Sequence, residues 1–99
     1  MRVLASLWAP VETETPYGGR VVSHEALGAV WLACGARRRR ETRDGETGPR
    51  GIETMTAETR ADPRLIEGRT VRFGGGDWII RMVEAVTPGR ARLSLERTR

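Results

Sequence analysis

Residues 69–97, RTVRFGGGDWIIRMVEAVTPGRARLSLER, decide the fold class of this chain. The segment contains three runs whose residue types or alternation favour strands: 69–73, 78–86 and 90–97. In the last run, Ala91, Leu93 and Leu95 alternate with Arg92, Ser94 and Glu96. Successive glycines in residues 74–77 permit the positive φ angles of a tight hairpin, and residues 87–89 turn the chain again. The segment therefore predicts three strands joined by two short turns.

Two further segments alternate with period two. In residues 2–8, Val3, Ala5 and Leu7 share one face, and Pro10 places the end of this strand near a sheet edge. Residues 51–60, GIETMTAETR, are rich in threonine, which predicts a partly exposed strand. The composition of residues 11–20 and 61–68 is typical of turns.

Residues 21–36, VVSHEALGAVWLACGA, fit either a helix or a strand by composition. The β-branched and aromatic residues favour a strand, and Gly28 and Gly35 would each weaken a helix by about 1 kcal/mol. We therefore predict an extended segment in which Gly28 marks a bulge or bend. A helix over residues 23–29 is the alternative.

The 99 residues fit one domain, residues 1–99, with a single small core. The pattern predicts an all-β fold, a small antiparallel β-barrel or sandwich of five to six strands with one long charged loop at about residues 37–52. The residues expected in the core are Leu7, Trp31, Phe73, Trp78, Ile80, Val83, Leu93 and Leu95.

Four consecutive arginines open this predicted loop. Residues 36–51, ARRRRETRDGETGPRG, hold six arginines and three acidic residues, an excess of +3 in a chain of net charge +4. The segment has no apolar periodicity, and a loop this long in a small domain is usually functional or disordered. Three hypotheses stay open: a solvated loop, a nuclear-type address, or contact with nucleic acid phosphates. All 17 basic residues are arginine, which a GC-rich genome would also explain.

Residues that carry enzyme chemistry are scarce. His24 is the only histidine and Cys34 the only cysteine, which excludes a His-based triad, a multi-histidine metal site and an internal disulfide within one chain. We expect Cys34 to be a small buried residue and His24 a polar one without a ligand role. Residues 74–78, GGGDW, lack the Lys-Ser/Thr ending of a phosphate-binding loop. We therefore predict no enzyme activity, no metal and no cofactor.

The tryptophans and the N-terminal segment each allow two interpretations. Trp8, Trp31 and Trp78 could be exposed platforms that stack nucleobases, but with five aromatic residues in all we expect them in the core. The apolar residues that follow Arg2 are interrupted by Ser6 and end at Pro10. They are too few for a signal peptide or a membrane span, so no membrane partner is expected.

The order of these elements resembles the phage head–tail joining proteins, also called head closure, stopper or adaptor proteins, a version of which occurs in the gene transfer agents of α-proteobacteria. The resemblance lies in four stretches: LWAPVETETPYGG, GAVWLACGARRRRE, ETRADPRLIEGRTVRFGGGDWIIRMVEAV and the closing RARLSLER. It covers nearly the whole chain, and it depends on order and spacing more than on any one motif.

The resemblance implies a β-barrel assembled into a ring, typically a hexamer. One side of the ring would meet the adaptor or portal-side ring and the other a tail terminator or tail-side protein. The long loop, here Arg37 to Ile52, would project toward the channel and help to retain packaged double-stranded DNA through non-specific contacts. Its channel- or DNA-facing residues would be Arg37, Arg38, Arg39, Arg40, Arg43 and Arg50. The protein would reside in the bacterial cytoplasm during assembly and then in the neck of a phage-like particle.

A binding module is the alternative from a different class. The same arginines, with exposed tryptophans, would suit a monomeric nucleic-acid-binding β-barrel of the OB type. A small enzyme is the third possibility and has no motif in its favour.

Overall fold

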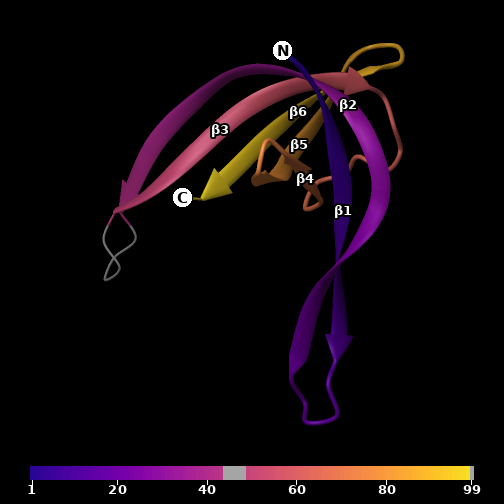
Figure 1. Ribbon diagram of the computed structural model, residues 1–99, viewed down its shortest axis with the longest axis vertical. Coiled ribbons are helices and arrows are strands. Elements are labelled where there is room, and N and C mark those ends of the chain that lie inside the picture. Colours follow the sequence, from indigo (N-terminus) through magenta and orange to yellow (C-terminus); the bar gives the residue numbers. More distant parts are fainter. Residues whose placement is uncertain (44–48, 99) are drawn as a thin grey trace.

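The computed structural model describes the backbone of residues 1–43 and 49–98 and the side chains of residues 1–39 and 51–97. It contains six strands: β1 (Arg2–Glu14), β2 (Arg20–Arg43), β3 (Pro49–Arg60), β4 (Thr70–Phe73), β5 (Gly76–Thr87) and β6 (Arg90–Thr98). They form a closed antiparallel barrel in the order β1-β2-β3-β6-β5-β4 (Figure 1). The described residues include no helix, and hence none that could cross a membrane. The predicted β-barrel is confirmed, and the alternative of a helix over residues 23–29 is wrong.

The shortest strand closes the barrel. Three residue pairs join β4 to β1, namely Ser6–Arg72, Leu7–Val71 and Trp8–Thr70. On its other side β4 forms a hairpin with β5 through Gly74 and Gly75, whose φ angles are 58° and 77°. Two successive positive φ angles suit the tight turns that match strand twist, so the glycines predicted to form this hairpin do so. Because β4 pairs with both β1 and β5, the barrel wall has no open sheet edge at this point.

Alternate residues of all six strands fill the barrel. The core consists mainly of Ala5, Leu7, Val30, Leu32, Met55, Ala57, Val71, Phe73, Trp78, Ile80, Leu93 and Leu95, with Leu65 from the segment after β3. Trp78 is the largest fully buried side chain and stacks on Phe73, with ring centroids 6.1 Å apart and ring planes 8° apart. Six of the eight residues expected in the core are thus buried.

Trp31 and Val83 are exceptions, and their predicted core positions are wrong. Val30 and Leu32 point inward, so strand alternation places Trp31 on the outer face, 56% exposed, opposite Leu4. Val83 lies opposite the buried Leu93, but it is 38% exposed. Since β4 pairs only with residues 76–79 of β5, the later residues of β5 have a neighbouring strand on one side alone. Trp8 is partly buried, so Trp78 is the only tryptophan of the three fully inside.

A bulge in β2 is held by the segment that follows β3. The pairing register of β1 and β2 shifts by one residue between the pairs Leu7–Gly28 and Trp8–Ala26. Leu27 is therefore the extra residue, and the predicted bulge is confirmed. Gly28 has φ 110°, and a Cβ added there would lie only 2.6 Å from the Arg64 Nη1 atom. That same nitrogen donates to the Leu27 carbonyl at 2.7 Å, while Asp62 accepts from the Arg64 Nη2 at 2.7 Å. Asp62 and Arg64 thereby tie the bulge to the chain after β3.

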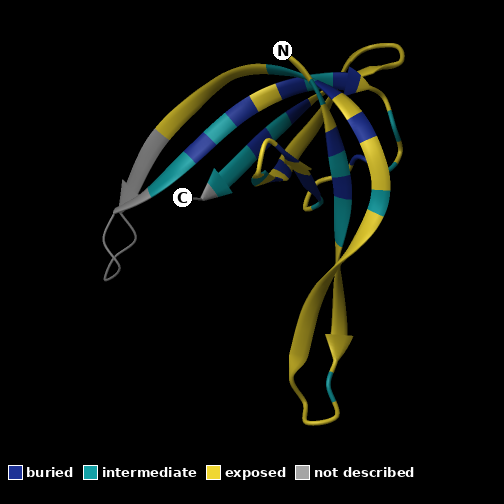
Figure 2. Cartoon of the chain, viewed as in Figure 1, coloured by how far each residue is buried: buried dark blue, intermediate teal, exposed yellow. Residues whose placement is uncertain are grey.

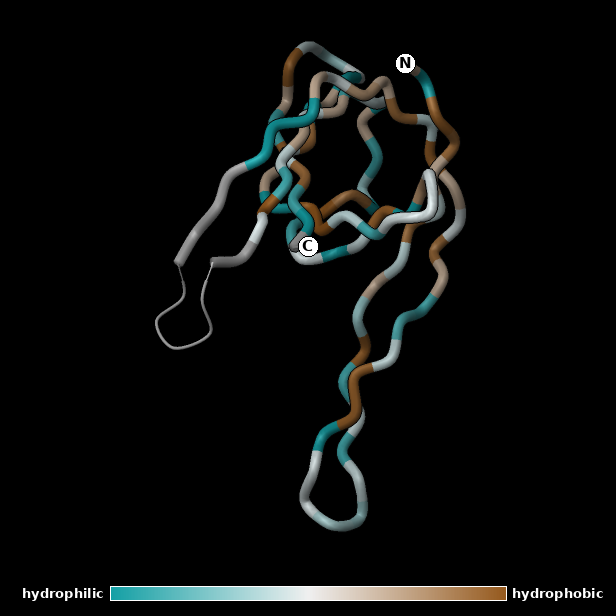
Figure 3. Tube along the Cα trace, turned by 60° about the vertical axis from the view of Figure 1, so that its left-hand side comes forward, coloured by the Kyte–Doolittle hydropathy of each residue, from teal (hydrophilic) through white to brown (hydrophobic). Residues whose placement is uncertain are grey.

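Two pairs of strands continue beyond the barrel wall as arms (Figures 1 and 3). The predicted turn over residues 11–20 is wrong for residues 11–14, which pair with residues 20–23 in β2. The predicted loop over residues 37–52 is also wrong, because residues 37–43 pair with residues 49–55. Its centre, residues 44–48, lies outside the described residues. Both arms are antiparallel strand pairs, so strand alternation sets which face their described side chains occupy.

Replacing Trp78 with alanine should lower the free energy of unfolding by about 3–5 kcal/mol, because a large buried ring is removed and leaves a cavity. Chemical denaturation monitored by circular dichroism would measure the change. Trp31→Ala is the matched control, with an expected loss below about 1 kcal/mol because the ring is on the surface. Equal losses for the two variants would contradict the burial described for them.

Acid should weaken the Asp62–Arg64 contact that holds the bulge, called here the bulge clamp. Hydrogen bonds from the Arg64 side chain hold the pKa of Asp62 below its ordinary 3.8. A lowered folded-state pKa means that the carboxylate stabilises the fold above pH 3.8 and loses this contribution as pH falls through the folded value. The thermal midpoint of Asp62→Asn should therefore fall less steeply with acid than that of the wild type. Part of the acid sensitivity should persist, because Arg72 lowers the pKa of Asp77 in the same way. Parallel acid profiles for the two proteins would show that the clamp does not contribute.

Candidate functional site: an arginine-rich hairpin

The arginine run lies in a β-hairpin that extends from the barrel, formed by residues 37–43 of β2 and 49–55 of β3 and called here the arginine hairpin. Its register pairs Arg37 with Met55, Arg39 with Glu53 and Arg43 with Pro49. All six arginines predicted to face DNA lie in these two strands: Arg37, Arg38, Arg39, Arg40 and Arg43 in β2 and Arg50 in β3. The structure thus brings the predicted site residues together on one element, although that element is a hairpin and not a loop.

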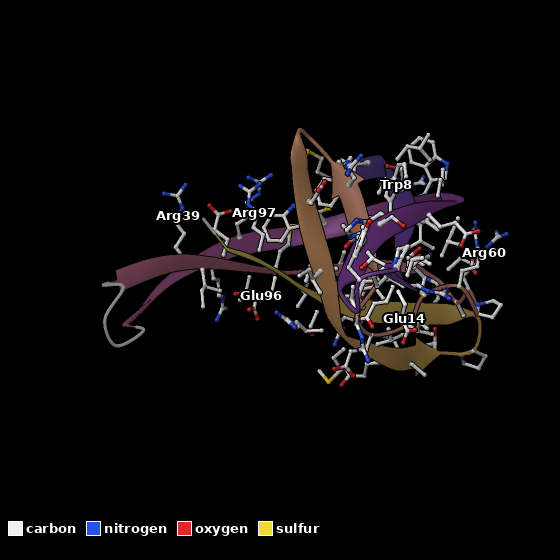
Figure 4. All side chains as sticks on the ribbon, turned by 90° about the horizontal axis from the view of Figure 1, so that it is seen from below. Trp8, Glu14, Arg39, Arg60, Glu96 and Arg97 are labelled. Atoms are coloured by element: carbon white, nitrogen blue, oxygen red, sulfur yellow. The ribbon has the colours of Figure 1, made fainter. Side chains whose placement is uncertain are left out.

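Strand alternation divides the described arginines between two faces. Directly paired residues of antiparallel strands share a face, so Arg37 and Arg39 lie with the buried Met55 and Glu53. Arg38 lies with Thr54 on the opposite face, beside a shallow pocket of about 500 Å³ that Arg81 and Glu96 also line. In Figure 4, Arg39 and Arg97 accordingly project to one side and Glu96 to the other.

The face of the hairpin that carries Arg37, Arg39, Met55 and Glu53 is called here the inner face. Its arginines gather around the buried carboxylate of Glu53. The Glu53 side chain is 1% exposed; its Oε2 accepts a hydrogen bond from Arg97 Nε at 3.1 Å and forms an ion pair with Arg97 Nη2 at 2.9 Å. Its Oε1 lies 3.3 Å from Arg39 Nε. A buried charge is tolerated only when it is paired, so this carboxylate requires arginines beside it. The ion pair between Glu53 and Arg97 fixes the base of the hairpin against β6.

Two guanidinium groups also lie on the core tryptophan. The Cζ atoms of Arg97 and Arg37 are 4.6 Å and 5.6 Å from the centre of the Trp78 ring. These are cation–π distances, and the buried ring lowers the cost of holding cations near the core. A Cβ at Gly76 would collide with the Arg97 guanidinium in this position, so glycine leaves room for it. The inner face therefore presents Arg37, Arg39 and Arg97 around one carboxylate, a cationic surface that suits phosphate or carboxylate groups.

Two members of this site, Glu53 and Arg97, are absent from the residues predicted from the sequence. Period-two alternation places Glu53 on the same strand face as Met55, Ala57 and Thr59. All four are buried, so an acidic residue among inward-facing positions was the available signal. Arg97 has no such signal, because its partner lies in a strand 44 residues away.

Other residues with reactive side chains form no site. His24 is exposed, and Cys34 is a partly buried free thiol. Burial raises the pKa of Cys34, an effect that the N-terminal amino group and Arg37 partly oppose, so the thiol stays protonated and weakly nucleophilic. Among the described residues no three His, Cys, Asp or Glu side chains gather in a way that could hold a metal ion.

No protein-family model matches this chain, and no curated protein matches it. Among solved structures the fold is similar to that of a chain described as part of the virion of a native gene transfer agent (GTA) particle, with a TM-score of 0.78 and 24% sequence identity. The match covers 98% of this chain and 94% of the other. At this identity the likeness establishes the fold, which extends over the barrel and both arms.

Glu53→Gln should reduce the free energy of unfolding by about 2 kcal/mol, since it removes the charge that Arg39 and Arg97 share. Glu12→Gln is the matched control: its ion pair with Arg20 is exposed, and its loss should cost less than about 0.5 kcal/mol. Urea titrations of both variants would measure the difference. A Glu53→Gln protein as stable as the wild type would show that the carboxylate does not anchor the hairpin.

Proposed function

We propose that this chain is a non-enzymatic ring component of a phage-like head–tail connector, of the stopper or head-closure type. The observation that carries the proposal is the near-complete match in fold to a chain of a gene transfer agent virion. The order and spacing of the sequence motifs resemble the same class of protein. In this function the chain joins the portal or adaptor side of the particle to the tail and helps to retain packaged double-stranded DNA.

The arginine hairpin supplies a physical reason for DNA retention. It extends away from the barrel, and its described arginines include Arg38 on an exposed face and Arg39 with its side chain 68% exposed. In a ring, several copies of the hairpin would converge on one aperture, and many weak phosphate contacts would then act together. Such contacts depend steeply on salt and ignore base sequence, as a channel for arbitrary DNA requires.

A monomeric nucleic-acid-binding barrel is the second candidate, and the exposed Trp31 favours it. Arg2 already lies over this ring, with its Cζ 5.5 Å from the centroid. Trp8 is engaged in a similar way by Arg72 at 4.8 Å, and Trp78 is inside the barrel. Strand platforms for single-stranded nucleic acid usually combine several exposed aromatic rings, so we rank this function lower. A persistent monomer that binds single strands tightly would favour it over the connector.

The connector is tested in the strain that carries the gene. Disruption should yield DNA-filled heads separate from tails, or heads that lose their DNA, when released particles are viewed by electron microscopy. Antibody against the chain should label the neck of intact particles. Normal tailed particles from the disrupted strain, or no detectable chain in purified particles, would overturn the proposal.

A second experiment isolates the arginine hairpin. Changing Arg37, Arg38, Arg39 and Arg40 together to serine should lower the stability of the chain, because Arg39 and Arg37 contact Glu53 and Trp78. It should still leave the chain folded, since Arg97 remains paired with Glu53. The nuclease-protected DNA in purified particles should fall several-fold, because phosphate contacts are lost. The matched control replaces exposed arginines outside the hairpin, Arg72 and Arg81, which are 50% and 53% exposed. Circular dichroism would verify folding of both proteins. Equal DNA retention by the two variants would exclude the hairpin from retention while leaving the structural role of the ring intact.

A further inference from the structure

The other arm of the molecule is acidic. It consists of residues 10–25, called here the acidic ribbon, where the end of β1 pairs with the start of β2. Glu12, Glu14 and Glu25 outnumber the single Arg20, so the ribbon has a net charge of −2 with His24 neutral. Apart from Thr15 its residues are exposed, and Figure 2 shows the arm extending away from the barrel. Among the described residues, only those near His24 at its base border this arm.

An aromatic side chain stands at the tip of the acidic ribbon. Tyr17 is 97% exposed, in a turn closed by hydrogen bonds from Thr15 N to Gly19 O at 2.8 Å and from Gly19 N to Thr15 Oγ1 at 3.0 Å. Tyrosine is among the residues most often found at the energetic centre of protein interfaces. An ordered turn that presents tyrosine beside glutamates is therefore suited to insertion into a cationic pocket of a partner.

The opposite end of β1 carries such a pocket. It has a volume of about 570 Å³, opens to the surface and is lined by the exposed Trp31 and by Arg2, Arg60 and Arg90, among others. We call it the Trp31 pocket. It is separate from the arginine hairpin, and Arg60 and Arg39 lie at opposite ends of the molecule in Figure 4.

The charges of the Trp31 pocket are unbalanced. Arg60 and Arg90 face each other directly across β3 and β6, an arrangement of like charges that destabilises a sheet. The two acidic residues of the lining are already paired with other arginines, Glu58 with Arg92 at 3.0 Å and Asp62 with Arg64, which also lines the pocket, at 2.7 Å. Within the described part of the chain, Arg2, Arg60 and Arg90 form no ion pair. A bound anionic group would relieve this repulsion.

We propose that the acidic ribbon of one copy of this chain docks into the Trp31 pocket of a second copy. Glu12 and Glu14 would pair with Arg60 and Arg90, and the Tyr17 ring would pack on Trp31. A chain cannot fill its own pocket in this way, because the 13 residues of β1 separate the two surfaces by roughly 40 Å. The contact joins different surfaces of two copies, so it repeats from copy to copy and produces a ring when the rotation closes. This docking would be the contact between subunits of the ring proposed above. The inference rests on the proposed function only for the closure of the ring.

Charge reversal of each surface provides the test. One variant carries Glu12→Arg and Glu14→Arg, and the other carries Arg60→Glu and Arg90→Glu. Wild-type protein at low salt should show masses that are multiples of 11.0 kDa by light scattering, and each variant alone should return to the monomer mass. An equimolar mixture of the two variants should associate again, because a reversed ribbon meets a reversed pocket and the two unreversed surfaces also match. Thermal melts would show that both variants are folded, since all four residues are exposed.

Three outcomes would overturn the proposal. The wild-type chain could stay monomeric at low salt and at the highest concentration attainable, both variants could associate as the wild type does, or the mixture could fail to associate. Fluorescence anisotropy with a short DNA duplex is a parallel measurement. If Arg60→Glu with Arg90→Glu abolishes duplex binding and leaves self-association unchanged, the pocket binds phosphates and not the ribbon. None of these results decides the connector function, which the particle experiments test separately.

Discussion

The ion pair between Glu53 and Arg97 is the constraint on which the rest of the structure depends. Glu53 occupies an inward-facing position of β3 at the point where the barrel wall becomes the arginine hairpin. Its charge can be buried only beside cations, and Arg97 and Arg39 supply them. The same Arg97 lies on the Trp78 ring, so the carboxylate, the hairpin and the largest core side chain form one cluster. The direction in which the hairpin leaves the barrel is thus coupled to the packing of the core.

Barrel closure explains why the arms exist. Closure uses a strand of only four residues, β4, whereas β2 has 24 residues and β1 has 13. Strand length that the barrel cannot use continues as two-stranded ribbons, whose residues are largely exposed where the structure describes them. One arm is acidic and the other is rich in arginine.

Local sequence features predicted the strands and turns well because each depends on neighbouring residues. The Gly74–Gly75 hairpin, the Gly28 bulge and the alternation of β6 all follow from residue types in short windows. The same reasoning wrongly predicted a loop for the arginine run. Identical residues on both faces remove the period-two signal, and only pairing with β3 makes the segment a strand. The predicted core positions of Trp31 and Val83 were wrong for a related reason. Their burial depends on which face a distant strand covers and on where β4 ends, and neither is a local property.

The structure also changes what the positive charge of the arginine run means. Counted from the sequence, residues 36–51 hold six arginines and a net charge of +3, and the count treats all six arginines as equivalent. Pairing divides the described arginines instead. Arg37 and Arg39 are partly committed to Trp78 and Glu53, and Arg38 faces away from them. A committed arginine has lost conformational freedom during folding and has less to lose when it binds an anion. Arg37 and Arg39 are therefore pre-organised on the face that also carries Arg97.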